Sequence, residues 1–209
     1  MVFFISVNKT RRSLKSRGPD LLCFLEVCDM KMDSARSLRS LILSGLFLAL
    51  GLLLPFLTGQ IPNIGRMLLP MHIPILLAGF VCGWPYGLAV GLICPMLRSV
   101  TFGMPPITSA VPMTFELAAY GFATGLLYKL FPKKNIYIYA ALIISMLFGR
   151  IVWAAASYGF YQIIGSSFTW EMFIAGAFVD ALPGIVVQIV LIPVIVMALK
   201  KAGYMGETE

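Results

Sequence analysis

Four ionisable side chains lie inside long apolar stretches of the chain, where charged groups are rare. They are Arg98, Glu116, Arg150 and Asp180. A charge in hydrocarbon is costly, so each of these groups should face the protein interior and find a partner there. Depths worked out at about 1.5 Å per helical residue favour a pair of Arg98 with Glu116. Arg150 and Asp180 lie deeper and would pair with each other.

These pairs have two interpretations, and both stay open. They could be buried salt bridges that only fix the packing of the helices. Alternatively, they could line a polar pocket, open to the outside, for an organic solute. Aromatic side chains follow Arg150 at helical spacing, and aromatic rings beside a cation suit a flat solute. Trp153 and Tyr158 therefore join the candidate binding residues, although aromatic stripes are also typical of a bundle core.

Three further polar residues accompany the first two apolar runs. Asn63 and Arg66, in IPNIGR, could close such a pocket as part of an outer loop. His72 lies in LLPMHIPILLAGFVCGWPYG, where Pro70 and Pro74 remove backbone donors and predict a partly unwound start to a short helix. A lone histidine is more often a hydrogen-bonded structural residue than a proton carrier, but its position keeps it among the candidates.

The composition of the chain is typical of a membrane protein, so transmembrane segments are expected to position these residues. Of the 209 residues, 59% are hydrophobic and 12% are charged, and several runs approach the ~20 apolar residues that cross a bilayer. Long continuous runs favour helices over a β-barrel. We therefore predict an all-α polytopic membrane protein with six transmembrane helices. The expected spans lie near residues 38–57, 67–83, 86–103, 110–130, 136–164 and 169–199.

Glycines recur every four residues across the turn between the second and third expected spans. They are Gly79, Gly83, Gly87 and Gly91. Small residues at this spacing let helix backbones approach closely. We therefore predict a tight hairpin, with packing and not ligand contact as the role of these glycines.

Positive residues gather on one side of such a six-span arrangement. That side carries Arg36, Arg39, Lys129, Lys133, Lys134, Lys200 and Lys201. The other side carries Arg66 and no lysine, so the positive-inside rule places both termini in the cytoplasm. The formal charge of +7 then reflects membrane topology, and no nucleic-acid partner is expected.

The first 31 residues differ from the rest, because they hold scattered charges and no run of span length. Their basic cluster follows the first apolar residues, unlike the order in a signal peptide. One hypothesis is that the natural chain begins at Met30 or Met32 and that residues 1–31 are an upstream extension. The other is a disordered basic tail near anionic headgroups. Residues 32–209 would form the six-helix membrane domain.

Sequence motifs of catalysis and nucleotide binding are absent from the chain. It contains no G-x-x-x-x-G-K-[ST], no H-E-x-x-H and no G-x-S-x-G. One histidine and four scattered cysteines predict no metal site, and no cofactor is expected. We therefore expect a binding or transport protein and not an enzyme. Any energy for transport would come from a partner or from an ion gradient.

The stretch LLPMHIPILLAGFVCGWPYGLAVGLICPMLRSVTFGMPP, followed by FELAAYGFATGLLY, resembles the substrate-binding S components of energy-coupling factor (ECF) transporters. The similarity runs from about residue 37 to the end of the chain. It implies a six-helix protein of the bacterial plasma membrane that captures a vitamin or related micronutrient from outside. Such a protein docks on a transmembrane coupling protein driven by two cytoplasmic ATPases. The family's pocket lies in the outer half, which agrees with Asn63, Arg98 and Glu116.

The resemblance also implies a partner interface on the first helix, where the family has an A-x-x-x-A pattern of small residues. The nearest matches are Gly45-x-x-x-Ala49 and, one turn earlier, Ser40-x-x-x-Ser44. The vitamin does not follow, since pantothenate, riboflavin, folate and a thiamin precursor are all compatible. The alternative is a self-sufficient secondary transporter of a small organic solute, coupled to protons through Glu116 and Asp180.

Overall fold

Helices make up all the regular structure that the computed structural model describes. The described residues are 19–57, 69–132, 134–165 and 181–203, with positions 169, 174 and 176, and no strand occurs among them. The helices are α2 (Pro19–Leu57), α4 (His72–Cys82), α5 (Trp84–Phe102), α6 (Ile107–Leu130), α7 (Asn135–Ile163) and α9 (Leu182–Lys201). The predicted all-α class is confirmed.

Five of the helices are long and apolar enough to cross a membrane, counting the Ser37–Phe56 part of α2. Helix α4, with 11 residues, is about 16 Å long and is shorter than the ~30 Å hydrocarbon core. The prediction of a polytopic membrane protein is therefore confirmed, with a short second apolar helix. The cytoplasmic location of both termini stays a prediction.

The last helix begins later than its predicted span, which started at residue 169. Helix α9 begins at Leu182, with Pro183 in its first turn, where a missing backbone N–H has no intrahelical partner anyway. Most of residues 166–180 lie outside the described part of the chain.

The chain divides into two units, one ending at Arg39 and one running from Ser40 to Glu209. This boundary falls within α2, eight residues after the predicted boundary at 31/32. Helix α2 begins at Pro19, so it includes residues 19–31 of the predicted tail. The hypothesis about the natural start stays a prediction.

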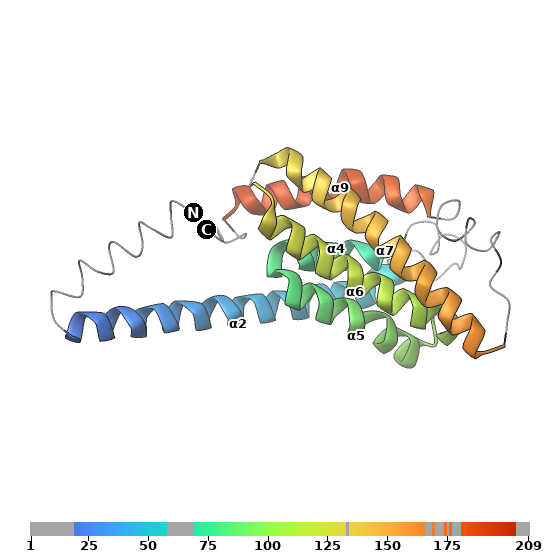
Figure 1. The fold of residues 1–209 in the computed structure, drawn as a ribbon, viewed down its shortest axis with the longest axis horizontal. Coiled ribbons are helices and arrows are strands. Elements are labelled where there is room, and N and C mark those ends of the chain that lie inside the picture. The colour runs from blue at the N-terminus through green and yellow to red at the C-terminus, as the bar shows by residue number, and fades with distance from the viewer. Residues whose placement is uncertain are drawn as a thin grey trace. The chain divides into compact units, whose positions relative to one another are not determined.

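Helix α6 is the central element of the second unit. It contacts α4, α5 and α7, while α9 packs against α4 and α7 (Figure 1). In the most apolar 18-residue segment of α6, 61% of the residues are buried inside the protein. In the corresponding segments of the other four long helices, 33% or fewer are buried. The small residues of α6 and the polar residues in its middle, Thr114, Glu116, Tyr120 and Thr124, are therefore surrounded by protein and not by lipid.

The glycines of α4 and α5 explain how closely these helices approach α6. A Cβ added at Gly79, Gly87 or Gly91 would clash with the backbone of α6, at Gly121 or Leu117. The predicted role in packing is confirmed, but the glycines join both helices to α6 as well as to each other. Gly83, at φ +90°, forms the turn between α4 and α5, a conformation that favours glycine.

Candidate functional site

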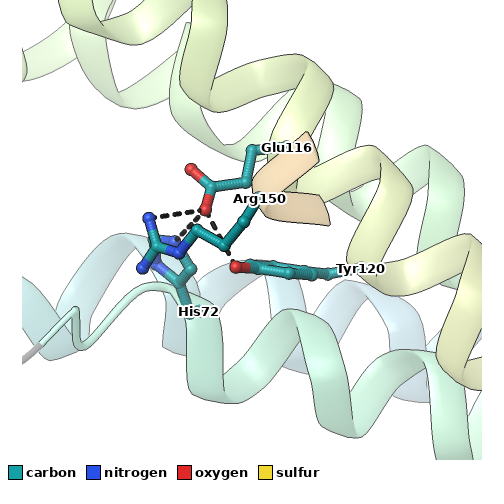
Figure 2. Close-up of polar contacts among 4 residues, drawn as sticks. All are labelled: His72, Glu116, Tyr120 and Arg150. Atoms are coloured by element: carbon teal, nitrogen blue, oxygen red, sulfur yellow. Dashed lines mark hydrogen bonds and ion pairs between the residues drawn. The ribbon is translucent and has the colours of Figure 1, made fainter. Parts of the chain in front are cut away.

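Glu116, on the buried face of α6, is the centre of a polar cluster of four residues (Figure 2). Its Oε1 lies 2.9 Å from Nη1 of Arg150 and 3.8 Å from Nε2 of His72. The hydroxyl of Tyr120 donates a 2.9 Å hydrogen bond to the same oxygen. All four residues are at most 9% exposed. One carboxylate oxygen therefore joins α4, α6 and α7, although the contact with His72 is too long for a hydrogen bond.

The local sequence explains why Tyr120 reaches Glu116. The two residues are four apart in α6 and so lie on one face of the helix. Opposite them, Gly149 in α7 leaves room for the tyrosine ring, since a Cβ at this position would clash with it. Arg150 follows directly in the chain. Helix α7 thus provides both the space for Tyr120 and the cation for Glu116.

His72 lies in the cluster because it is the first residue of α4, and α4 begins next to Glu116. Leu69 has a positive φ of 47°, and a turn at Pro70 and Met71 precedes the first helical residue. Pro74 lies in the first turn, where its missing N–H costs no helical hydrogen bond. The predicted non-helical start is confirmed for Leu69–Met71, whereas His72 and Pro74 already belong to the helix. The imidazole lies 5.5 Å from the ring of Tyr120, measured between centroids.

Several buried polar atoms have no hydrogen-bond partner within the part of the chain that the structure describes. They are Nε and Nη2 of Arg150, both ring nitrogens of His72, and both side-chain amide atoms of Gln188. Gln188 belongs to α9, which packs against α4 and α7. An unpaired buried polar group costs about 1–3 kcal/mol. Such atoms are rare in folded proteins and indicate a place for water or a ligand.

The predicted pair of Arg98 with Glu116 is wrong. Arg98 donates from Nη1 to the backbone carbonyl of Leu52. Its guanidinium lies 4.9 Å from the ring centroid of Phe56 and 5.6 Å from that of Phe102. These contacts join α5 to the end of α2. Depth along a helix does not show which face carries a side chain, and depths compare poorly between helices that tilt.

Arg150 forms its described ion pair with Glu116. Asp180, its predicted partner, lies outside the described residues, and so do Asn63 and Arg66. The roles predicted for these three residues stay predictions. Of the candidate binding residues, the structure therefore brings together His72, Glu116 and Arg150.

The aromatic residues after Arg150 divide between two faces of α7. Trp153 is partly buried, and a Cβ at Gly176 would lie 2.8 Å from its indole ring. Tyr158 is 58% exposed, so it is not part of the buried cluster. At about 100° per residue, Ser157 lies ~20° from Arg150 around the helix, but Tyr158 lies ~80° away.

The small residues predicted to form a partner interface on α2 differ in their exposure. Gly45 and Ala49 are exposed, and a Cβ at Gly45 would meet nothing within 4 Å. Ser40 is half-buried. Ser44 is buried, and its hydroxyl donates a 2.7 Å bond to the Leu41 carbonyl. Ser44 therefore does not belong to an exposed face.

Two residues of interest are missing from the candidates predicted from sequence. Tyr120 follows Glu116 by one helical turn, a spacing that could have identified it. Gln188 is the one polar residue between Leu182 and Ala198, and an isolated amide in an apolar helix is a comparable signal. Neither carries a formal charge, so neither stands out in an apolar helix as strongly as Glu116 or Arg150 does.

The cluster offers recognition chemistry: donors from arginine, histidine and tyrosine, and an acceptor from one carboxylate. The described residues contain no group of three or more His, Cys, Asp or Glu side chains that could hold a metal ion. A family model described as "ECF transporter, substrate-specific component" matches residues 39–196. No curated protein and no solved structure matches the chain.

Proposed function

The chain belongs to the substrate-specific components of ECF transporters, and on that premise we propose that it captures a water-soluble vitamin or related micronutrient outside the cell. Delivery would go through a coupling membrane protein powered by two ATPases. The observation that carries this proposal is the buried cluster around Glu116, in which polar atoms of His72 and Arg150 have no partner among the described residues.

The unpaired atoms favour a binding site over a structural salt bridge. A pair that only fixes helix packing is stable when its remaining donors are also satisfied. Here Glu116 forms an ion pair with one of the three guanidinium nitrogens of Arg150, and the other two nitrogens have no partner in the described structure. His72 adds two further unpaired nitrogens. A substrate with hydrogen-bonding groups would satisfy them, and its binding would gain the energy that their burial costs.

The position of the cluster along the helices supports access from one side. Glu116 lies nine residues after the start of α6 at Ile107, and Arg150 lies thirteen residues before the end of α7 at Ile163. At about 1.5 Å per residue, these distances are roughly 13 Å and 20 Å from the same end of two antiparallel helices. In the predicted topology this end faces the outside.

The exposed surface of α2 supports a partner or lipid contact within a membrane. Leu41, Ile42, Leu46 and Leu53 are 54–64% exposed. Gly45 and Ala49 lie on the exposed side of the same helix. Small residues between large apolar ones let another helix approach closely, as docking on a coupling protein requires. We propose the bacterial plasma membrane as the location of this multi-pass protein.

One observation favours a second candidate function, a proton-coupled secondary transporter. His72 and Glu116 are both titratable and lie 3.8 Å apart within apolar helices, where such pairs occur in proton relays. In this case the protein would transport its solute without ATPases.

Reconstitution in proteoliposomes separates the two functions. The protein would be inserted alone, or together with a coupling protein and its two ATPases, and loaded with internal ATP or given a proton gradient. Vitamin uptake that requires the complete assembly and ATP is the expected result. Uptake by the protein alone, driven by the proton gradient and abolished by Glu116→Gln, would overturn the receptor proposal in favour of the carrier.

A further inference from the structure

We propose that the substrate of this chain carries a carboxylate, and that this group binds to the Nε–Nη2 edge of Arg150. The inference rests on the proposed receptor function and adds the chemical class of the substrate. Some hydrogen-bonding atoms of the cluster are paired with each other, and others have no partner among the described residues.

Within the part of the chain that the structure describes, one complete edge of the Arg150 guanidinium has no partner. Nη1 is occupied by Glu116 at 2.9 Å, while Nε and Nη2 are buried and unpaired among the described residues. In a guanidinium, the N–H bonds of Nε and Nη2 point in parallel along the same edge. Two parallel donors match the two oxygens of a carboxylate, which they bind as a bidentate pair.

The other unpaired atoms nearby also favour a ligand rich in acceptors. Both ring nitrogens of His72 are unpaired among the described residues, and every protonation state of imidazole has at least one N–H donor. Oε1 of Glu116 already accepts from Arg150 and Tyr120. The two remaining atoms of Arg150 are both donors, and a carboxylate is a group that only accepts.

The charges of the cluster balance a bound carboxylate only in the protonated state of His72. Glu116 offsets the charge of Arg150, so a second carboxylate would leave one net negative charge if His72 were neutral. His72 lies 3.8 Å from Glu116 and would supply the balancing positive charge when protonated. Charge-assisted hydrogen bonds are roughly twice as strong as neutral ones, which favours a carboxylate over an uncharged pair of acceptors for a buried arginine.

Matched ligand pairs test this proposal on the unaltered protein, so folding of a variant is not at issue. The purified protein in lipid nanodiscs would be titrated with pantothenate and panthenol, nicotinate and nicotinamide, and biotin and biotin amide. Riboflavin and thiamin, which lack a carboxylate, complete the panel. We expect one carboxylate to bind and its neutral counterpart to bind at least tenfold more weakly, by calorimetry.

The outcomes separate this inference from the receptor function. Binding of riboflavin, thiamin or a neutral counterpart as the preferred ligand would keep the receptor function and overturn the carboxylate. Absence of binding throughout the panel, together with absence of uptake by the complete assembly, would count against both.

A substitution then tests the edge itself. Arg150→Lys keeps the positive charge but removes the parallel pair of donors. We expect it to weaken binding of the preferred carboxylate at least tenfold, whereas Arg39→Lys, a control in the other unit of the chain, should leave affinity unchanged. Equal affinity for Arg150→Lys and the unaltered protein would overturn the bidentate contact.

Discussion

The ion pair between Glu116 and Arg150 can be tested by a double-mutant cycle. Glu116→Gln keeps the size of the side chain and its ability to accept the bond from Tyr120, but it removes the charge. Arg150→Met removes the guanidinium and keeps an apolar stem of similar shape. Each single variant leaves the other partner buried in the protein without its counter-charge, whereas the double variant leaves no buried charge of the pair.

The geometry sets the expected size of the coupling energy. Breaking a buried ion pair on one side costs about 3–5 kcal/mol in soluble proteins, while neutral hydrogen bonds between membrane helices average only ~0.6 kcal/mol. The contact is ionic, 2.9 Å long and almost fully buried. We therefore expect a coupling energy of about 1.5–3 kcal/mol, towards the upper end of the range for residues in contact.

The assay is reversible unfolding in mixed detergent micelles, titrated with sodium dodecyl sulfate and followed by circular dichroism. A parallel cycle of Glu116→Gln with Arg98→Met is the control, because Arg98 contacts Leu52, Phe56 and Phe102 instead. This control should be additive within about 0.5 kcal/mol. Coupling below that limit in the Arg150 cycle, or equal coupling in both cycles, would refute the pairing.

Three further substitutions, followed by the same titration, test the surrounding contacts. Gly87→Ala should cost about 1–3 kcal/mol more than Gly45→Ala, because a Cβ meets the α6 backbone at Gly87 and open space at Gly45; similar midpoints would contradict this packing. Tyr120→Phe removes the bond to Glu116 and should cost about 1.5 kcal/mol, but nothing in a Glu116→Leu background; the same cost in both backgrounds would assign the loss to another contact. Arg98→Ala should cost about 2 kcal/mol through its buried aromatic and carbonyl contacts, and an unchanged midpoint would show that these contacts do not stabilise α2.

The fold class could be predicted because the hydropathy and length of an apolar run indicate whether a helix is surrounded by lipid or by water. Five long apolar helices follow from continuous runs in the sequence, and the two prolines before Ile75 correctly indicate a short helix with a non-helical start. The position of α6 at the centre could not be read in this way. Helix α6 is no more apolar than α5, and burial by protein instead of lipid depends on the packing of all the helices.

Three of the four members of the cluster were predicted from sequence, but their pairing was not. Glu116, Arg150 and His72 stand out in sequence because titratable groups are rare in apolar helices. Which of them meet depends on the rotation and tilt of each helix, and α7, with 29 residues, is about 43 Å long and must tilt or emerge from the hydrocarbon core. Arg98 illustrates the point, because it lies in a similar apolar setting and faces α2.

The contacts around Glu116 form a closed path that starts and ends on α7. Gly149 makes room for the ring of Tyr120, Tyr120 donates to Glu116, and Glu116 holds Nη1 of Arg150, the residue that follows Gly149. A shift of α7 by one residue against α6 would put the bulk of Arg150 where the ring needs space and would turn the guanidinium away from the carboxylate. In the proposed site Glu116 would act as a positioning residue, because its contact with Nη1 limits the directions in which the Nε–Nη2 edge can point. A glycine within a helix costs about 1 kcal/mol relative to alanine. At Gly149 the missing side chain leaves room for the ring of Tyr120, and Tyr120 in turn donates to the carboxylate that contacts Arg150.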